Sequence, residues 1–138
     1  MIKFTKERSV SIDDVLHLYQ AVGWTNYTNQ PQMLEQALSH SLATYLARDG
    51  EEIVGLVRLV GDGFSSVFVQ DLIVLPSYQR QGIGSNLMKE ALADYKDAYQ
   101  IQLATEQTEK TLGFYRSLGF ETLSTYDCTG MIWVDRKR

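Results

Sequence analysis

The chain has 138 residues, of which 44% are hydrophobic and 22% are charged, as is ordinary for a soluble globular protein. This length fits a single domain over residues 1–138, which can bury enough surface to need neither a disulfide nor a structural metal. The formal net charge of −4 argues against a dedicated nucleic-acid binder, which needs a basic face. No long apolar stretch follows the amino terminus, so we expect a cytoplasmic protein with no membrane partner.

The amino-terminal part predicts a short strand and two helices. Residues 2–6 favour the strand. Ser11, followed by two acidic residues, is typical of a helix N-terminus, and apolar residues then recur at helical spacing up to Gly23. Pro31 suits the first turn of a second helix, which carries its own apolar stripe. Residues 23–30 are then expected to form the loop between the two helices.

The middle of the chain changes to the periodicity of strands. Residues 42–48 and 53–60 read as strands joined by Asp49-Gly50, a strong hairpin signal. A second turn at residues 61–63 leads to a third strand over residues 65–75. The centre of the predicted sheet is therefore an antiparallel meander.

Helices and strands alternate in the carboxy-terminal half. We expect a long helix over residues 82–95, a strand over 100–105, and a short helix over 110–118 that Gly119 closes. Two terminal strands, 121–126 and 131–135, are predicted to form the last hairpin. The whole pattern predicts a mixed α/β (α+β) fold in which helices flank a largely antiparallel sheet.

The turn before the long helix has the composition of an anion site. Its glycines let the backbone approach a ligand, and the first turn of the helix offers free N–H groups at the positive end of the helix dipole. Arg80 could add charge at the rim. No Gly-Lys-Ser/Thr follows, which excludes a Walker loop, and Gly82-x-Gly84 lacks the third glycine of a dinucleotide fingerprint. A pyrophosphate group fits such a turn.

This turn resembles the acyl-CoA signature of the GNAT superfamily of N-acetyltransferases, Gln/Arg-x-x-Gly-x-Gly/Ala, through Gln79, Gly82 and Gly84. Residues 114–120, Phe-Tyr-Arg-Ser-Leu-Gly-Phe, resemble a second element of that family at its usual separation. The resemblance implies a GNAT-like fold whose splayed sheet holds acetyl-CoA, as co-substrate, in a V-shaped gap without a metal. It also implies which residues bind acetyl-CoA: the backbone of Leu72, Ile73 and Val74 for the pantetheine arm, and Gln79, Arg80, Gln81, Gly82, Ile83, Gly84 and Ser85 around the pyrophosphate.

Acetyl transfer to an amine needs three further groups. A base or a water chain must accept the amine proton, a donor must stabilise the oxyanion, and the departing thiolate needs a proton. By resemblance, Tyr115 occupies the position of the general acid, and a backbone N–H near Val74 could serve the oxyanion. Asp71 is the best-placed carboxylate for the base, and its alternative role is that of a structural acceptor. The resemblance further implies that some members of this superfamily, which acetylate protein N-termini, carry a Glu at the position of Leu103, so that arrangement is absent here.

The acceptor side is expected at the loop of residues 23–30. Trp24 and Tyr27 could form the wall of a pocket for a flat or cationic amine, or they could cover the core. The Gly23-Trp24 pair and residues 130–133 also resemble the GNAT branch that includes arylalkylamine (serotonin-type) acetyltransferases.

Three functions remain open on the sequence alone. The leading prediction is transfer of acetyl from acetyl-CoA to a primary amine of a small molecule. The alternatives are a protein or peptide acetyltransferase acting on lysine or an N-terminal amine, and a non-catalytic acyl-CoA-binding module. A homodimer is compatible with the sequence, which does not establish it.

Overall fold

The computed structural model describes residues 1–135, and its contacts divide the chain after Leu103 into two compact units. The first unit, Met1–Leu103, holds the sheet and the helices α1 to α4, and the second begins at Ala104. That the whole chain forms a single domain stays a prediction. Over residues 1–135, no helix combines the length and the apolar character that crossing a membrane requires.

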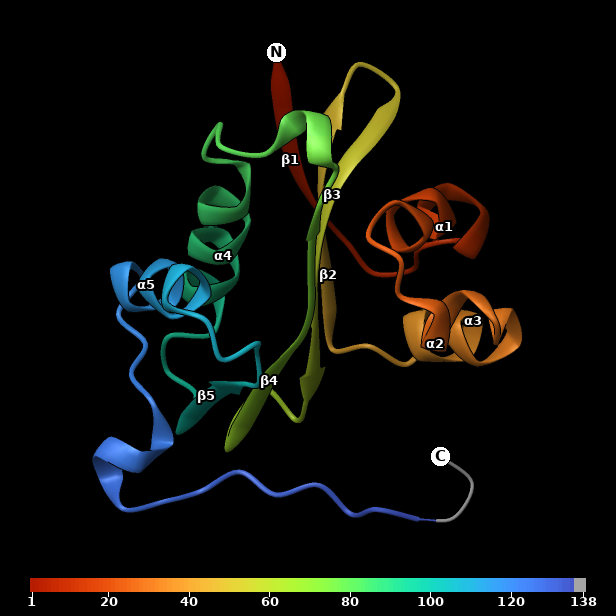
Figure 1. The fold of residues 1–138 in the computed structure, drawn as a ribbon. Helices are drawn as coiled ribbons and strands as arrows, with labels where there is room; N and C mark the ends of the chain where they lie inside the picture. The colour runs from red at the N-terminus through yellow and green to blue at the C-terminus, as the bar shows by residue number, and fades with distance from the viewer. Residues whose placement is uncertain (136–138) are drawn as a thin grey trace. The chain divides into compact units, whose positions relative to one another are not determined.

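A five-stranded sheet forms the centre of the first unit (Figure 1). The first four strands pair antiparallel in chain order, and the last pairs parallel with its neighbour. This arrangement confirms the predicted mixed α/β fold with a largely antiparallel sheet. The strands are β1 (Ile2–Glu7), β2 (Ala43–Asp49), β3 (Glu52–Gly61), β4 (Ser66–Val74) and β5 (Gln100–Leu103).

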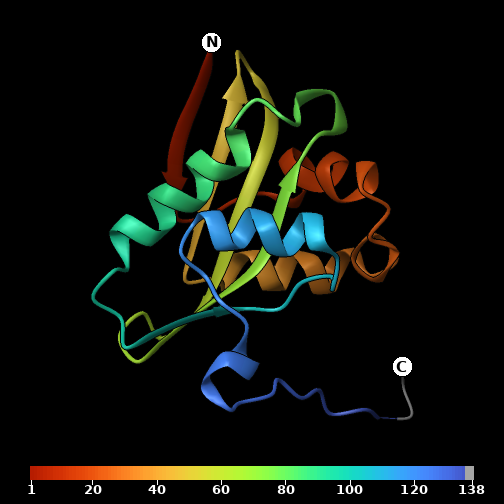
Figure 2. The ribbon, with the colours of Figure 1, turned by 60° about the vertical axis from the view of Figure 1, so that its left-hand side comes forward.

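Helices cover both faces of this sheet (Figures 1 and 2). One face carries α1 (Ile12–Ala21), α2 (Thr25–Thr28) and α3 (Pro31–Ser39), and the other carries α4 (Ile83–Asp94). Ser11 caps α1 by accepting a hydrogen bond from the backbone N–H of Asp13, as its sequence position predicts.

Helix α2 corrects the expectation of an irregular loop over residues 23–30. The backbone carbonyl of Trp24 accepts hydrogen bonds from the N–H groups of Tyr27 and Thr28, which closes one helical turn. A helix of four residues is too short for apolar periodicity to reveal it, because the pattern needs about eleven residues to be recognised.

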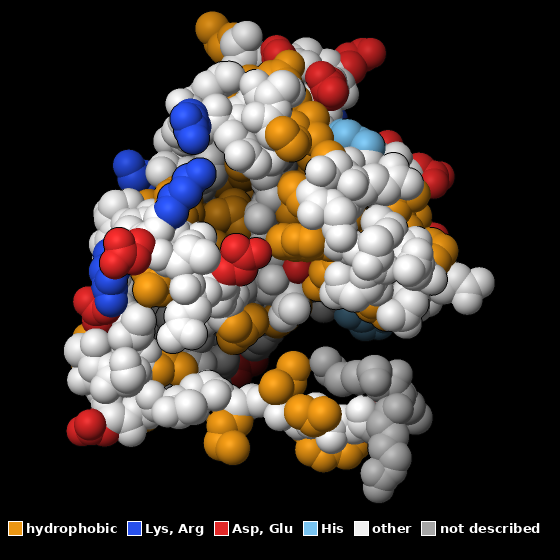
Figure 3. Space-filling view, in the orientation of Figure 1, with side chains coloured by type: hydrophobic (Ala, Val, Ile, Leu, Met, Phe, Trp, Pro, Cys, Tyr) orange, Lys and Arg blue, Asp and Glu red, His pale blue; other side chains and the backbone are white. Residues whose placement is uncertain are grey.

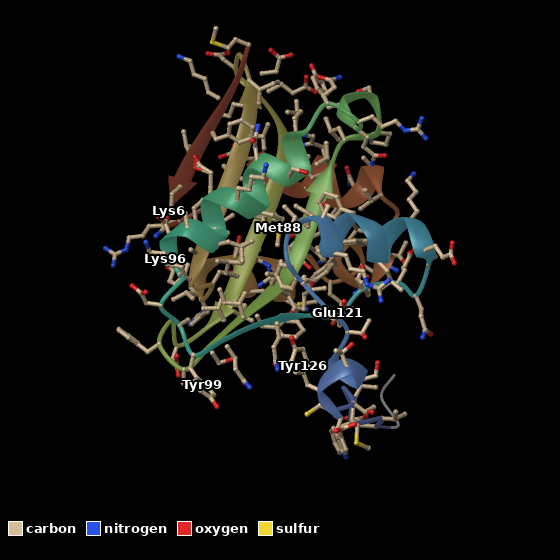
Figure 4. All side chains as sticks on the ribbon, turned by 90° about the vertical axis from the view of Figure 1, so that its left-hand side faces the viewer. Lys6, Met88, Lys96, Tyr99, Glu121 and Tyr126 are labelled. Carbon is tan, nitrogen blue, oxygen red and sulfur yellow. The ribbon has the colours of Figure 1, made fainter. Side chains whose placement is uncertain are left out.

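The core lies on both faces of the sheet. Large side chains from α1 and α3, such as Leu18 and Leu34, are fully buried against β3 and β4. On the other face, Met88 of α4 is fully buried and lies between the helix and the sheet (Figure 4). Gly55 of β3 allows α4 to approach closely, since a Cβ there would lie 3.2 Å from side-chain atoms of both Ile83 and Leu87. The first turn of α4 is therefore fixed relative to the sheet.

Strand β4 contains a β-bulge at Gln70. Asp71 lies opposite Arg58 of β3, but Val69 lies opposite Leu59, so Gln70 is an extra residue without a partner of its own. Neighbouring residues of β3 point to opposite faces, and their partners on β4 must do the same. Val69 and Asp71 consequently point to opposite faces of the sheet, although two residues apart they would normally share one.

The second unit contains α5 (Glu109–Ser117), which the hydroxyl of Thr108 caps through the backbone N–H of Thr111. The predicted terminal hairpin is wrong. Residues 123–126 form a short 3₁₀ helix, η2 (Leu123–Tyr126), and residues 131–135 form no strand. A strand needs a partner for its backbone hydrogen bonds, and alternating apolar residues cannot supply one by themselves.

Candidate functional site

The sheet splays at the middle of β4. Strands β4 and β5 pair only between residues 66–69 and 100–103, whereas β4 continues to Val74 alongside β3 alone. The predicted pantetheine-binding residues Leu72, Ile73 and Val74 thus lie where β4 has no pairing with β5. The side-chain amide of Gln79 donates to the carbonyl of Val74 at 3.0 Å, which ties the signature glutamine to this stretch of strand.

The turn that follows β4 presents an open helix N-terminus. It passes through a short 3₁₀ helix, η1 (Pro76–Tyr78), and reaches α4 at Gly82, whose φ of 79° lies in the left-handed region. No side chain of the described chain caps α4, so the N–H groups of its first turn remain available as donors. A Cβ at Gly82 would meet no atom within 4 Å. This geometry suits a phosphate group, which binds where free N–H groups and the positive helix end converge.

Arg80 has a left-handed backbone as well, with a φ of 66°. An arginine in this region is uncommon, and such strain is found where the surrounding structure holds the backbone for a purpose. Its side chain is exposed beside the first turn of α4. The predicted pyrophosphate residues Gln81, Ile83, Gly84 and Ser85 follow directly, so the whole predicted set lies in one continuous turn and helix start.

Asp71, the predicted base, lies inside a buried polar network. It is 2% exposed and forms an ion pair of 2.7 Å with the Nε of Arg58, which is 4% exposed. The Tyr19 hydroxyl donates to the same Oδ2, and the Tyr27 hydroxyl donates to Oδ1, each at 2.8 Å. Burial and the charge of Asp71 raise the pKa of both tyrosines above the usual value. Both hydroxyls therefore stay protonated as donors to the carboxylate.

Arg58 is not among the site residues predicted above, although its position in the sequence carries a signal. Arg58 is the one charged residue in the otherwise apolar stretch of residues 53–60. A charge in a buried strand requires a partner, and the only question is which carboxylate provides it. Burial opposes its charge but the neighbouring Asp71 outweighs burial, so the pKa of Arg58 is raised.

The two predicted acceptor residues lie together at α2. Trp24 is half-buried, and its ring centroid lies 6.2 Å from that of Tyr27. Tyr27 itself is 8% exposed and packs edge-on against Tyr19 at 5.0 Å. Tyr27 thus belongs to the core through its ring and to the polar network through its hydroxyl, whereas Trp24 keeps part of its surface exposed.

Tyr115, the predicted general acid, lies on α5 in the second unit. Its ring packs edge-on against Phe114 at 5.0 Å and Phe120 at 5.9 Å. Burial raises the pKa of the Tyr115 hydroxyl above its usual value, and a hydrogen bond with Thr105 opposes that shift. The hydroxyl is thus protonated at neutral pH, as a proton donor must be.

Other polar residues have structural partners. Asp62 accepts hydrogen bonds from the Ser65 hydroxyl and from the backbone N–H groups of Phe64, Ser65 and Ser66, which stabilise the turn between β3 and β4 and lower the pKa of Asp62. His17 contacts the carbonyl of Ile53 at 2.7 Å. Residues 1–135 contain no group of three or more His, Cys, Asp or Glu side chains arranged to hold a metal ion.

Comparison with known proteins places the chain in a family. The family model of the acetyltransferase (GNAT) domain matches residues 40–122. A solved structure, the GNAT family acetyltransferase SP0256 from Streptococcus pneumoniae TIGR4, is 74% identical, with 99% of each chain covered and a TM-score of 0.91. The protein belongs to the GNAT family of acetyltransferases.

Two curated plant relatives are more distant. GCN5-related N-acetyltransferase 1, chloroplastic, from Arabidopsis thaliana is 28% identical over 94% of this chain. Serotonin N-acetyltransferase 2, chloroplastic, from Oryza sativa subsp. japonica is 33% identical over 66% of this chain. The chain spans 65% and 48% of the lengths of these two relatives.

Proposed function

We propose that this protein is an acetyl-CoA-dependent N-acetyltransferase whose acceptor is the primary amine of a small molecule. The observation that carries the proposal is the uncapped N-terminus of α4 beside the open position at Gly82. The stretch of β4 without a β5 partner adjoins it in the chain and supplies backbone groups for the pantetheine arm. Together they offer donors for a pyrophosphate and for the amides that follow it in acetyl-CoA.

The reaction is direct attack on the thioester. The amine nitrogen bonds to the acetyl carbonyl carbon, the carbon–sulfur bond breaks, and CoA leaves as its thiolate. The amine loses one proton and the thiolate gains one, so the transfer is balanced without any other reactant. Tyr115 is the proposed donor of that proton, because its raised pKa keeps the hydroxyl protonated.

The catalytic role of Asp71 stays a prediction, and its contacts support the alternative structural role. Its two oxygens already accept hydrogen bonds from Tyr19, Tyr27 and Arg58. Accepting a proton would require the carboxylate to give up part of its ion pair in the core. Water that leads from the amine to solvent is the other route for the proton.

Two observations favour a small-molecule acceptor over a peptide. Trp24 offers a partly exposed aromatic surface at α2, and aromatic faces attract organic cations. The rice relative carries the name of a serotonin N-acetyltransferase, and serotonin is a small aromatic primary amine. The peptide acetyltransferase and the non-catalytic module remain as the alternatives that an assay must separate.

The test is an amine panel in which the release of free CoA from acetyl-CoA is followed. The panel holds arylalkylamines, aliphatic polyamines, lysine-containing peptides and peptides with a free N-terminus. We expect turnover with a small primary amine, and arylalkylamines are the first class to try. Turnover with peptides alone would replace the proposed acceptor. Acetyl-CoA binding without turnover of any amine would favour the non-catalytic module.

We also propose that two copies associate through the segment Met131, Ile132, Trp133 and Val134, which we call the apolar tail. Its four side chains are 69% to 94% exposed, and hydrophobic atoms are visible along the segment in Figure 3. Burying one tail removes about 400 Å² of apolar surface, so with its receiving surface it makes an interface of about 800 Å². One tail by itself lies below the size of a specific interface, but two exchanged tails reach the standard size.

A further inference from the structure

Helix α2 depends on side-chain contacts to keep its place on the sheet. A helix of four residues is far too short to be stable alone. The Tyr27 hydroxyl donates to Asp71 at 2.8 Å and accepts from the Nη2 of Arg58 at 3.1 Å. The guanidinium of Arg58 also lies 5.9 Å from the centroid of the Tyr27 ring. Through one residue, α2 is thus joined to both β3 and β4.

The same network reaches the other helices on this face. Tyr19 connects α1 to Asp71, and the Nη1 of Arg58 donates to the hydroxyl of Ser41 after α3 at 3.3 Å. Within residues 1–135, no buried side-chain nitrogen or oxygen lacks a hydrogen-bond partner. Every buried polar atom of the network is therefore paired, and loss of one side chain leaves another buried group without its partner.

Stability alone does not explain such a network. Removing two charges from water costs about as much as their attraction returns, and apolar residues of equal volume often stabilise a core as well or better. The ion pair instead fixes the orientation of the side chains that it joins. The planar fork of Arg58 fixes the carboxylate of Asp71, whose two oxygens in turn fix two tyrosines.

We propose that Arg58 is a positioning residue for acceptor binding, acting through Asp71 and Tyr27 on α2. This inference rests on the proposed function, in which the acceptor amine binds beside residues 23–30. Because the Tyr27 hydroxyl is engaged and its side chain is buried, the aromatic surface left for the acceptor is that of Trp24. Arg58 sets the place of Trp24 because it fixes Tyr27, against which Trp24 packs.

The kinetic test compares Tyr27→Phe and Arg58→Lys with Tyr45→Phe as the matched control. Tyr45 is also buried and donates to a carboxylate, that of Asp94 at 2.6 Å, but Asp94 belongs to α4 on the opposite face. We expect Tyr27→Phe and Arg58→Lys to raise the KM for the acceptor about five- to tenfold, the effect of about one lost hydrogen bond. The KM for acetyl-CoA should change less than about twofold, since α4 and the signature turn are untouched. Tyr45→Phe should leave the acceptor KM unchanged.

A second readout needs no acceptor. The chain has two tryptophans, so Trp133→Phe leaves Trp24 as the single tryptophan, whose emission can be excited apart from that of the tyrosines. In that background Tyr27→Phe should shift the Trp24 emission to the red and increase its quenching by acrylamide, whereas Tyr45→Phe should do neither. Unchanged Trp24 fluorescence and acceptor KM in a folded Tyr27→Phe protein would overturn the inference, as would equal effects in the control. If the wild type turns over no amine, the proposed function is refuted but the positioning role of Arg58 is not, because the Trp24 fluorescence still tests that role.

Discussion

At the scale of single residues, Tyr115 is the proposed proton donor that can be tested most directly. Tyr115→Phe keeps the ring that packs against Phe114 and Phe120 but removes the hydroxyl. We expect kcat to fall about 100-fold, the lower end of what a general acid contributes, with acetyl-CoA affinity unchanged. Tyr126→Phe is the control, because Tyr126 lies in the same unit and is 70% exposed (Figure 4).

The pH profile of kcat follows from the same residue. A general acid must be protonated, so activity falls as pH rises through its pKa. Burial raises the pKa of Tyr115 above the usual value of 10.0. The fall of kcat on the alkaline side of the pH profile should therefore lie above about pH 10. Tyr115→Phe should lack this fall. A fall that begins near pH 7 in the wild type and persists in the variant would show that a different group controls the protonation.

At the scale of elements, the turn into α4 predicts the effect of bulk at Gly82. Gly82→Trp should abolish acetyl-CoA binding, measured by calorimetry, because the indole would fill the space beside the first turn of the helix. Gly82→Ala is the matched control. Both variants carry the cost of about 1–2 kcal/mol for a side chain at positive φ, but only the larger one adds bulk. Undiminished affinity in a folded Gly82→Trp protein would contradict the site.

The elements also show what the sequence can and cannot predict. The turn and α4 were predictable because their signals are local: glycines, a helix start and an apolar stripe within about twenty residues. The pairing of Arg58 with Asp71 was not, because it depends on the register of β3 and β4 and on the bulge at Gln70. The predicted terminal hairpin was wrong for a similar reason. Residues with alternating apolar side chains form a strand only where a neighbouring strand pairs with them.

At the scale of the whole molecule, the apolar tail predicts a dimer. Light scattering after size exclusion should give twice the chain mass of 15.7 kDa. Ile132→Pro removes a backbone N–H from the tail, and Trp133→Ser removes its largest apolar surface, so both should shift the mass towards the monomer. Phe64→Ser is the control, because it removes an aromatic side chain that is 84% exposed in the turn between β3 and β4. A monomeric wild type, or a dimer that neither tail variant weakens, would contradict the proposal.

The bulge at Gln70 also constrains how this protein can vary in length. Up to Val69 the odd-numbered residues of β4 face α4. From Asp71 onward the odd-numbered residues face α1 and α2 instead. Loss of the one extra residue would turn Asp71 away from Arg58 and leave two unpaired charges in the core. In a lineage of related chains, the extra residue and the Arg–Asp pair should therefore be inherited together or lost together. Substitutions along β4 can accumulate one at a time, but a change in its length there cannot.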